Sequence, residues 1–145
     1  MPVSKGLVRF HTLEPFTFSD RKKLKDAIML LMEEEGREFK SLDYIFCSDE
    51  YLLEINRQYL QHDELTDIIT FDLSEDKGEV IGEIYISVER VADNAMLFNT
   101  GFNDEFCRVV FHGALHLCGY DDKSSDEEAI MREREDYYLR RLGNR

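Results

Sequence analysis

A long apolar segment in the C-terminal half places the strongest constraint on what this chain can fold into. Residues 104–118 read as one helix, with Asn103 as a candidate N-cap and Gly119 as the residue that ends it. Two histidines, His112 and His116, lie four residues apart in this segment. On a helix that spacing places both imidazoles on one face, about one turn apart. The fold therefore has to position an apolar helix that carries two imidazoles on the same side.

Short strand-like runs alternate with helical patterns along the rest of the sequence. β-Branched and aromatic residues predict strands at residues 7–11, 42–47, 68–71 and 80–87. Amphipathic spacing predicts helices at 20–35 after an N-cap at Ser19, from Ser48 toward Tyr59, at 88–99, and after a capping box at Ser124–Glu127. A short link between the last two strands indicates a hairpin. This order predicts an α+β fold in which helices cover a small mixed β-sheet.

Length and composition narrow the class of protein. A chain of 145 residues fits one domain, residues 1–145, with a core of its own. The net charge of −13 disfavours non-specific binding to nucleic acid, and DNA is not an expected partner. The sequence has neither a transmembrane-length apolar run nor a secretory signal, so we expect a cytoplasmic protein without a membrane partner. Cys47, Cys107 and Cys118 cannot all pair within one chain and are expected to be free thiols.

The residues around Gly119 predict a metal site. Gly119 can take a left-handed conformation and turn the chain back toward the histidine face, which gives the pattern His-x3-His-x2-Gly-x2-Asp. We therefore predict His112, His116 and Asp122 as ligands of a zinc ion, with Asp121 as a competing candidate for the third position. Three protein ligands leave the fourth position open for water, which is the arrangement of a catalytic site. The predicted fold thus contains a zincin-like metal-binding helix in a metallohydrolase domain.

Other interpretations of the same residues remain open at this point. Both histidines could be core residues with satisfied hydrogen bonds. Cys118 could complete a structural site of four protein ligands, although its position two residues after His116 points it away from the histidine face. Nickel or iron could also occupy a site of two imidazoles and one carboxylate.

Several motifs resemble the YbeY family of bacterial rRNA maturation endoribonucleases. The first is His-Gly-x-Leu-His-Leu-x-Gly-Tyr-Asp at residues 112–121. Residues 53–59 with Asp63, followed by residues 66–71, are similar to the central stretch of the family, and residues 81–87 resemble its Gly-Asp/Glu-Ile strand. Residues 127–132 with Glu135 resemble its C-terminal helix. These matches occur in the family's order and cover most of the chain.

The resemblance implies a function and also shows two departures. It implies cleavage of single-stranded RNA and a part in maturing the 3′ end of small-subunit rRNA, with the small ribosomal subunit as partner, and the cofactor that we expect is the zinc ion predicted above. The family usually has a third histidine where this chain has Asp122, and an arginine where it has Leu60. Arg57, one helical turn from Leu60, is the candidate replacement, so we predict His112, His116 and Arg57 as catalytic residues.

Two further functions compete with the nuclease. A zinc metalloprotease of the His-Glu-x-x-His kind places its general base beside the first histidine, where this chain has Gly113. A non-catalytic ribosome assembly factor would use the metal only to hold its last helices together. For the nuclease, either a metal-activated water or the ribose 2′-hydroxyl could attack phosphorus.

Overall fold

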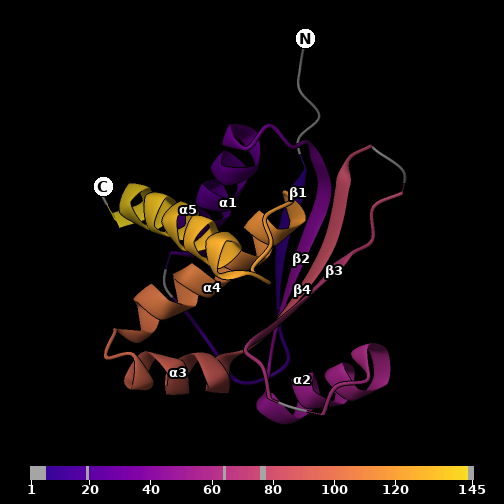
Figure 1. Cartoon of the computed structure of the whole chain (residues 1–145), viewed down its shortest axis with the longest axis vertical. Helices are drawn as coiled ribbons and strands as arrows, with labels where there is room; N and C mark the ends of the chain where they lie inside the picture. Colours follow the sequence, from indigo (N-terminus) through magenta and orange to yellow (C-terminus); the bar gives the residue numbers. More distant parts are fainter. Residues whose placement is uncertain (1–5, 19, 64, 76–77, 144–145) are drawn as a thin grey trace.

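The computed structural model describes residues 6–18, 20–63, 65–75 and 78–143 of the chain (Figure 1). The elements, in chain order, are β1 (Leu7–Thr12), α1 (Arg21–Glu34), β2 (Phe39–Cys47), α2 (Asp49–Ile55), η1 (Asn56–Leu60), β3 (Ile68–Asp72), β4 (Val80–Ser87), α3 (Val88–Leu97), α4 (Phe102–Leu117) and α5 (Ser125–Gly143). The predicted order of strands and helices is confirmed. The π-helical segment η1, which continues α2, is an addition.

Four strands form one mixed sheet in the order β1-β2-β4-β3. β1 pairs parallel with β2, and β2 pairs parallel with β4. β3 pairs antiparallel with β4, so the predicted hairpin is confirmed. β3 is therefore an edge strand, and α4 packs beside it.

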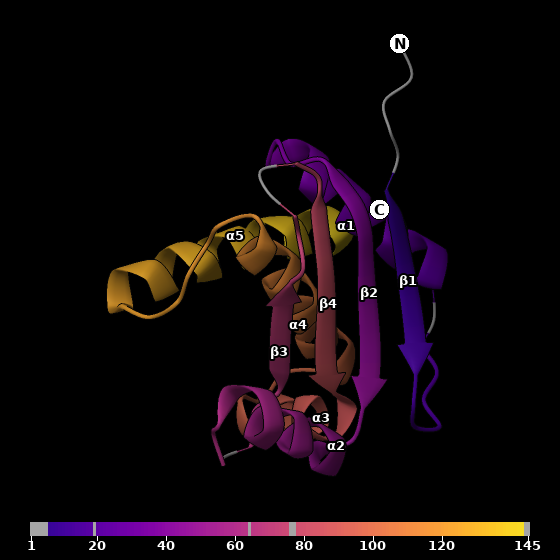
Figure 2. The ribbon, with the colours of Figure 1, turned by 90° about the vertical axis from the view of Figure 1, so that its right-hand side faces the viewer.

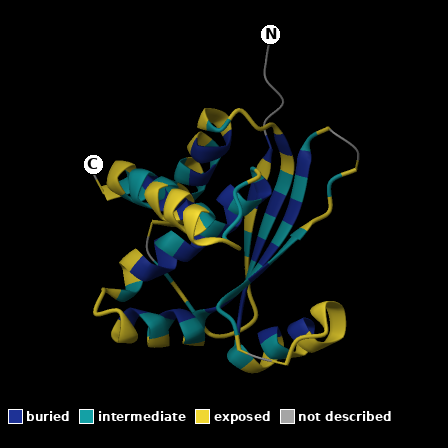
Figure 3. Cartoon of the chain, viewed as in Figure 1, coloured by how far each residue is buried: buried dark blue, intermediate teal, exposed yellow. Residues whose placement is uncertain are grey.

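Helices cover one face of the sheet almost completely and the other face only at one end. In Figure 2 the strands lie in front of α4 and α5, and α2 crosses the lower end of the near face. The covered face supplies the core: Leu42, Tyr44 and Phe46 of β2 and Ile84 and Ile86 of β4 are fully buried. Figure 3 shows this buried layer between sheet and helices, with exposed residues along the outer side of α5. The mixed sheet covered by helices is thus confirmed.

The helix ends follow local chemistry in most places. The Ser48 hydroxyl accepts a hydrogen bond from the Tyr51 N–H, as an N-cap does. The predicted capping box is present, because the Ser124 hydroxyl accepts from the Glu127 N–H and the Glu127 carboxylate accepts from the Ser124 N–H. The prediction of Asn103 as N-cap is wrong: α4 begins at Phe102, two residues before the predicted start, and Gly101 is its N-cap. Ser19 lies outside the described residues.

Further expectations from the sequence concern the cysteines and membrane-spanning segments. Cys47, Cys107 and Cys118 are free, as predicted. No helix in the described ranges combines the length and apolarity that crossing a bilayer requires.

One carboxylate joins three separate parts of the helical layer. Glu35, at the end of α1, accepts hydrogen bonds from the Tyr120 hydroxyl at 2.9 Å and the Tyr138 hydroxyl at 2.7 Å. The guanidinium of Arg134 lies 2.9 Å from the same carboxylate. Burial alone would raise the pKa of Glu35, but the two hydroxyls and the guanidinium outweigh it and hold that pKa below its usual value. Glu35 thereby ties α1 to α5 and to the loop that follows α4.

We predict that Glu35→Gln lowers the free energy of unfolding at neutral pH by about 1–3 kcal/mol, because a neutral amide loses the charge-assisted bonds. The stabilisation from a carboxyl with a lowered pKa is complete above the unfolded-state pKa and is lost as the pH falls through the folded-state pKa. Urea denaturation at neutral and acid pH should therefore show a difference that shrinks in acid. Glu33→Gln, an exposed change on the same helix, is the control and should be nearly silent. An equal effect of the two changes contradicts the prediction.

Candidate metal and active site

The two predicted histidines face one way from the C-terminal half of α4. Their rings are nearly parallel, 9° apart in plane, with centroids separated by 6.2 Å. Gly119 has a φ of 111°, a conformation that favours glycine, and it turns the chain back after the helix as predicted. This turn brings the Nε2 atom of His112 to 3.3 Å from the Asp122 carboxylate. It also places Asp121 3.9 Å from His116 Nε2.

A cavity of about 600 Å³ has His112, His116 and Asp122 in its lining. α4 and β3 form its walls, and residues of η1 and the following loop close one side. Its ionisable lining residues are His62, Asp67, Glu105, Arg108, His112, His116, Asp122 and Glu135. The structure therefore brings His112, His116 and Asp122 together in one cavity.

Glu135 on α5 holds the first histidine. Its carboxylate is buried and lies 2.7 Å from His112 Nδ1, while its other oxygen accepts a bond from Arg108 at 2.9 Å. Arg108 also donates to Asp136 at 2.6 Å. A carboxylate at Nδ1 places the ring proton there and leaves Nε2 free to bind a cation. Burial alone would lower the pKa of His112, but the hydrogen bond and charge of Glu135 and the charge of Asp122 raise it.

The sequence pointed to Glu135 only through the family resemblance and did not assign it a role. A signal was present, because Met131, Glu135 and Tyr138 are the buried positions of α5 and share one helical stripe. An acid in an apolar stripe is seldom buried without a specific partner. That partner is His112, which lies on another helix.

The second histidine presents one usable nitrogen. His116 Nδ1 is buried and has no hydrogen-bond partner among the described residues. Nε2 is consequently the nitrogen available for a ligand. The thiol of Cys118 points elsewhere, with its Sγ 3.6 Å from the Sδ of Met32 on α1. Cys118 therefore packs between helices and does not join the histidines.

The donor set fits a zinc ion in chemistry and partly in spacing. Two ligand atoms of a tetrahedral zinc, each about 2.0–2.1 Å from the ion, lie roughly 3.3 Å apart. The distance of 3.3 Å between His112 Nε2 and Asp122 matches that edge. Within the described ranges, no three histidine, cysteine or acidic side chains are already drawn together as a complete ligand set. Binding of one ion by all three side chains would thus require them to move closer together.

Two more carboxylates line the cavity. Burial raises the pKa of Asp67, which receives a 3.5 Å hydrogen bond from the Asn94 amide. Burial and then the neighbouring Asp67 raise the pKa of Glu105. Carboxyl groups with raised pKa values can exchange protons nearer neutrality than ordinary ones. The cavity therefore combines candidate cation ligands with candidate proton-transfer groups.

Arg57, the predicted catalytic arginine, is placed differently. It is exposed on η1, and its Nε donates to Asp63 at 2.6 Å. It is not among the described residues that line the cavity, whereas Leu60 is. Arg108 is the arginine in the wall, and it is already held by Glu135 and Asp136. The structure does not bring Arg57 together with the histidines.

Gly113 occupies the position of the protease glutamate, and packing explains the glycine. A Cβ atom built at Gly113 would lie 2.8 Å from Ile84 Cγ2 and 3.1 Å from Ile68 Cδ1. These contacts face the sheet, so a larger side chain here would enter the core. The helix therefore cannot carry a general base at this position without moving off the sheet.

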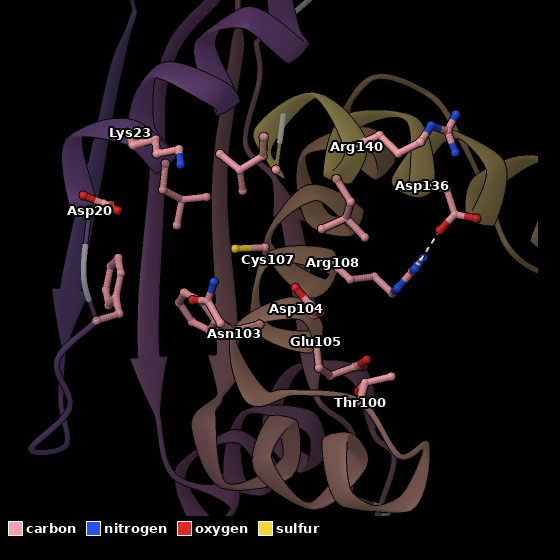
Figure 4. Close-up of a pocket in the computed structure, with 16 residues that line it drawn as sticks. Asp20, Lys23, Thr100, Asn103, Asp104, Glu105, Cys107, Arg108, Asp136 and Arg140 are labelled. Atoms are coloured by element: carbon pink, nitrogen blue, oxygen red, sulfur yellow. Dashed lines mark hydrogen bonds and ion pairs between the residues drawn. The ribbon is translucent and has the colours of Figure 1, made fainter. Parts of the chain in front are cut away.

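A second cavity of about 460 Å³ adjoins the first one (Figure 4). It lies between α1, α4 and α5 and shares Glu105 and Arg108 with the histidine cavity. Figure 4 shows Arg108 directed toward Asp136 from α4. Charges of both signs line it, with no histidine among the described lining residues. Both predicted histidine ligands therefore line the first cavity and not this one.

Comparisons with known proteins match the chain along nearly all of its length. A family profile described as Endoribonuclease YbeY matches residues 12–143. The chain is 47% identical over 124 residues to Endoribonuclease YbeY of Cytophaga hutchinsonii, covering 86% of this chain and 87% of the relative. It is 53% identical over 106 residues to the Flavobacterium psychrophilum protein of the same name, covering 73% and 75%. The solution structure of TM1509 from Thermotoga maritima aligns with a TM-score of 0.66 at 31% identity, covering 94% of this chain and 89% of that one.

We predict that Gly113→Ala destabilises the protein by about 1–3 kcal/mol, because the new methyl group would overpack the contact with β4. The sign of the change is informative, since an uncrowded glycine-to-alanine change inside a helix stabilises by up to about 1 kcal/mol. Chemical denaturation monitored by circular dichroism measures the difference. Gly143→Ala, at the exposed last residue of α5 where a Cβ meets open space, is the control and should change stability little. A stabilised Gly113→Ala protein contradicts the packing argument.

Proposed function

Because the chain belongs to the YbeY endoribonuclease family, we propose that it is a metal-dependent endoribonuclease that cleaves single-stranded RNA. The resemblance predicted from its motifs is confirmed by the family match. The metal-dependent part rests on the arrangement of Glu135, His112 and Asp122. The Glu135 carboxylate orients the His112 imidazole, and the Asp122 carboxylate lies at ligand spacing from the other nitrogen of that ring.

His112, His116 and Asp122 are the residues that we propose to hold a zinc ion. Zinc, when bound, lowers the pKa of a coordinated water and polarises a phosphoryl oxygen. Glu135 fixes the ring of His112, and Arg108 fixes Glu135. This second layer of contacts keeps Nε2 directed toward the cavity.

Asp67 and Glu105 have a separate role in the proposal. Both line the cavity, and burial makes each carboxyl easier to protonate. A carboxyl of this kind accepts a proton from an attacking hydroxyl or returns one to the leaving oxygen. We retain Arg57 as a predicted contact to RNA, at the outer side of η1.

The substrate that we propose is the 3′ region of small-subunit rRNA, within the small ribosomal subunit and in the cytoplasm. The support is the family membership, since members named endoribonucleases act on RNA. DNA is not a proposed partner, because the relatives are named endoribonucleases and the acidic chain disfavours non-specific binding to nucleic acid.

The metalloprotease alternative loses support from the packing of α4. Its general base would have to stand at Gly113, where the sheet leaves no room for a side chain. The alternative of a non-catalytic assembly factor predicts that RNA remains intact when the metal site is occupied, so a cleavage assay separates it from the nuclease.

We predict that the purified protein cleaves a single-stranded RNA oligonucleotide, that a chelator stops the reaction, and that added Zn²⁺ restores it. His112→Ala should abolish cleavage, because it removes one of the proposed ligands and leaves one oxygen of Glu135 without its hydrogen-bond partner. Gel separation of end-labelled RNA measures the products, and circular dichroism checks the fold of the variant. An intact RNA with zinc-loaded protein overturns the nuclease, whereas cleavage that survives both chelation and His112→Ala overturns only its metal dependence.

The two neighbouring aspartates offer a matched test of the third ligand. Asp122→Asn should weaken zinc binding at least about tenfold, while Asp121→Asn should change it little, because only Asp122 lies at ligand spacing from His112. Competition with a chromophoric chelator measures both affinities. The reverse order of effects would assign the third ligand to Asp121.

A related pair of variants on α5 tests the orienting carboxylate. Glu135→Gln should reduce zinc affinity by about 10–100-fold, because the amide orients the imidazole less firmly than the charge does. Asp136→Asn is the control, since it removes the neighbouring partner of Arg108 and keeps the bond to His112. Equal losses in the two variants would mean that the helix contact as a whole, and not the Glu135 charge on His112, controls the metal.

A further inference from the structure

The open face of the sheet carries a row of aromatic side chains outside the candidate active site. The aromatic row consists of Tyr51 of α2, Tyr59 of η1, Phe71 of β3 and Tyr85 of β4. Figure 2 shows this face toward the viewer, with α2 crossing its lower end and no helix over the strands above it. Tyr59 is 64% exposed and Tyr51 is 45% exposed, while Phe71 and Tyr85 are partly buried.

The four rings are in continuous contact. Tyr51 and Tyr85 have centroids 6.5 Å apart and planes inclined by 24°. Tyr85 meets Phe71 edge to face at 5.8 Å, and Phe71 meets Tyr59 in the same way at 5.9 Å. The contacts hold each ring in place, so the exposed faces of Tyr59 and Tyr51 are preorganised.

The aromatic row and the histidine cavity lie on the two sides of β3. Alternation along this edge strand directs Ile68 and Thr70 toward α4, and directs Phe71 to the open face. Leu60, the neighbour of Tyr59, also lines the cavity. A strand of RNA that crosses the free edge of β3 beside Tyr59 would thus pass directly from the row to the histidines.

We propose that the aromatic row is a binding subsite for single-stranded RNA, on which bases adjacent to the cleaved bond stack, with Tyr59 as the principal contact. The proposal rests on the endoribonuclease function and deepens it. Bases of single-stranded RNA are recognised by stacking on aromatic side chains presented by a sheet. Such stacking tolerates any sequence, because every base has a π-face.

The charges around the row favour contact through bases and not through phosphates. Arg57, beside Tyr59, is paired with Asp63, and Tyr85 donates a hydrogen bond to Glu83. The chain as a whole has a net charge of −13. A surface of this kind gains little from neutralising phosphates, whereas stacking does not depend on net charge. The affinity contributed by the row should consequently vary little with salt.

The direct test places a fluorescent reporter in the row. The chain has no tryptophan, so Tyr59→Trp introduces a single one. Addition of a short 2′-O-methyl single-stranded oligoribonucleotide should quench its fluorescence, because a base stacks on the indole. The same sequence as a duplex should not, because its bases are already stacked. The salt dependence of the titration measures the electrostatic share of binding.

Matched substitutions separate stacking from apolar docking. Tyr59→Ala should weaken binding of the oligonucleotide about 5- to 150-fold, the range for loss of one base stack. Tyr59→Phe should retain affinity, and Tyr59→Leu should lose it, since leucine keeps apolar area but has no π-face. Phe98→Ala, an equally simple change at a ring that is 56% exposed at the end of α3, is the control and should leave binding unchanged.

Each outcome bears on the proposal separately from the nuclease function. An unquenched tryptophan together with unchanged binding by Tyr59→Ala overturns the subsite even if the wild-type protein cleaves RNA. Full affinity in Tyr59→Leu also overturns it, because apolar contact, as with a protein partner, would then account for the surface. Quenching without cleavage by wild-type protein leaves the subsite standing and refutes the endoribonuclease.

Discussion

The close approach of α4 to the sheet is the constraint on which the site depends. Gly113 faces Ile84 and Ile68, and Gly82 on β4 faces Leu117 so closely that a Cβ there would lie 2.4 Å from its Cδ1. Because neither glycine has a side chain, the backbone of α4 at Gly113 packs against side chains of the sheet, and the backbone of β4 at Gly82 packs against a side chain of α4. The hydroxyl of Tyr44 adds a hydrogen bond of 2.9 Å to the Val110 carbonyl from within the buried face. The histidine face is consequently fixed against β3, and the cavity has a rigid wall.

The site also depends on a buried charge, the carboxylate of Glu135, beside that wall. Glu135 is 5% exposed, and an isolated carboxylate at such a position would cost several kcal/mol of desolvation. Arg108 and His112 each satisfy one of its oxygens. These contacts offset the cost of burying Glu135, and the contact with His112 also selects the tautomer of that ring. The packing of α5 on α4 and the orientation of His112 Nε2 toward the cavity therefore depend on the same carboxylate.

The sequence predicted the parts of the structure that depend on neighbours along the chain. The capping box at Ser124, the hairpin and the turn at Gly119 each follow from a few adjacent residues, and each is present. Asn103 was predicted as an N-cap from its residue type alone. The prediction is wrong because the apolar Phe102 packs against the core and already belongs to the helix.

Contacts between residues far apart in the sequence could not be predicted from neighbouring residues. Glu135 meets His112 across 23 positions, and the aromatic row assembles residues from α2, η1 and two strands. The position of Arg57 could not be predicted from local spacing either. Its spacing from Leu60 placed it one turn away, but the π-helical η1 and the bond to Asp63 hold it outside the cavity.

The charge of the cavity would give the proposed metal ion a second role besides its chemistry. Asp67, Glu105, Asp122 and Glu135 line it against one arginine, whose guanidinium is already used. An RNA phosphate entering this group meets an excess of negative charge, which disfavours binding. A dication held by the histidines, as we propose, would offset that excess beside the entering phosphate, and the same ion would then serve both catalysis and substrate binding. Recognition of the flanking bases would then rest on the aromatic rings on the other side of β3, because stacking does not depend on net charge.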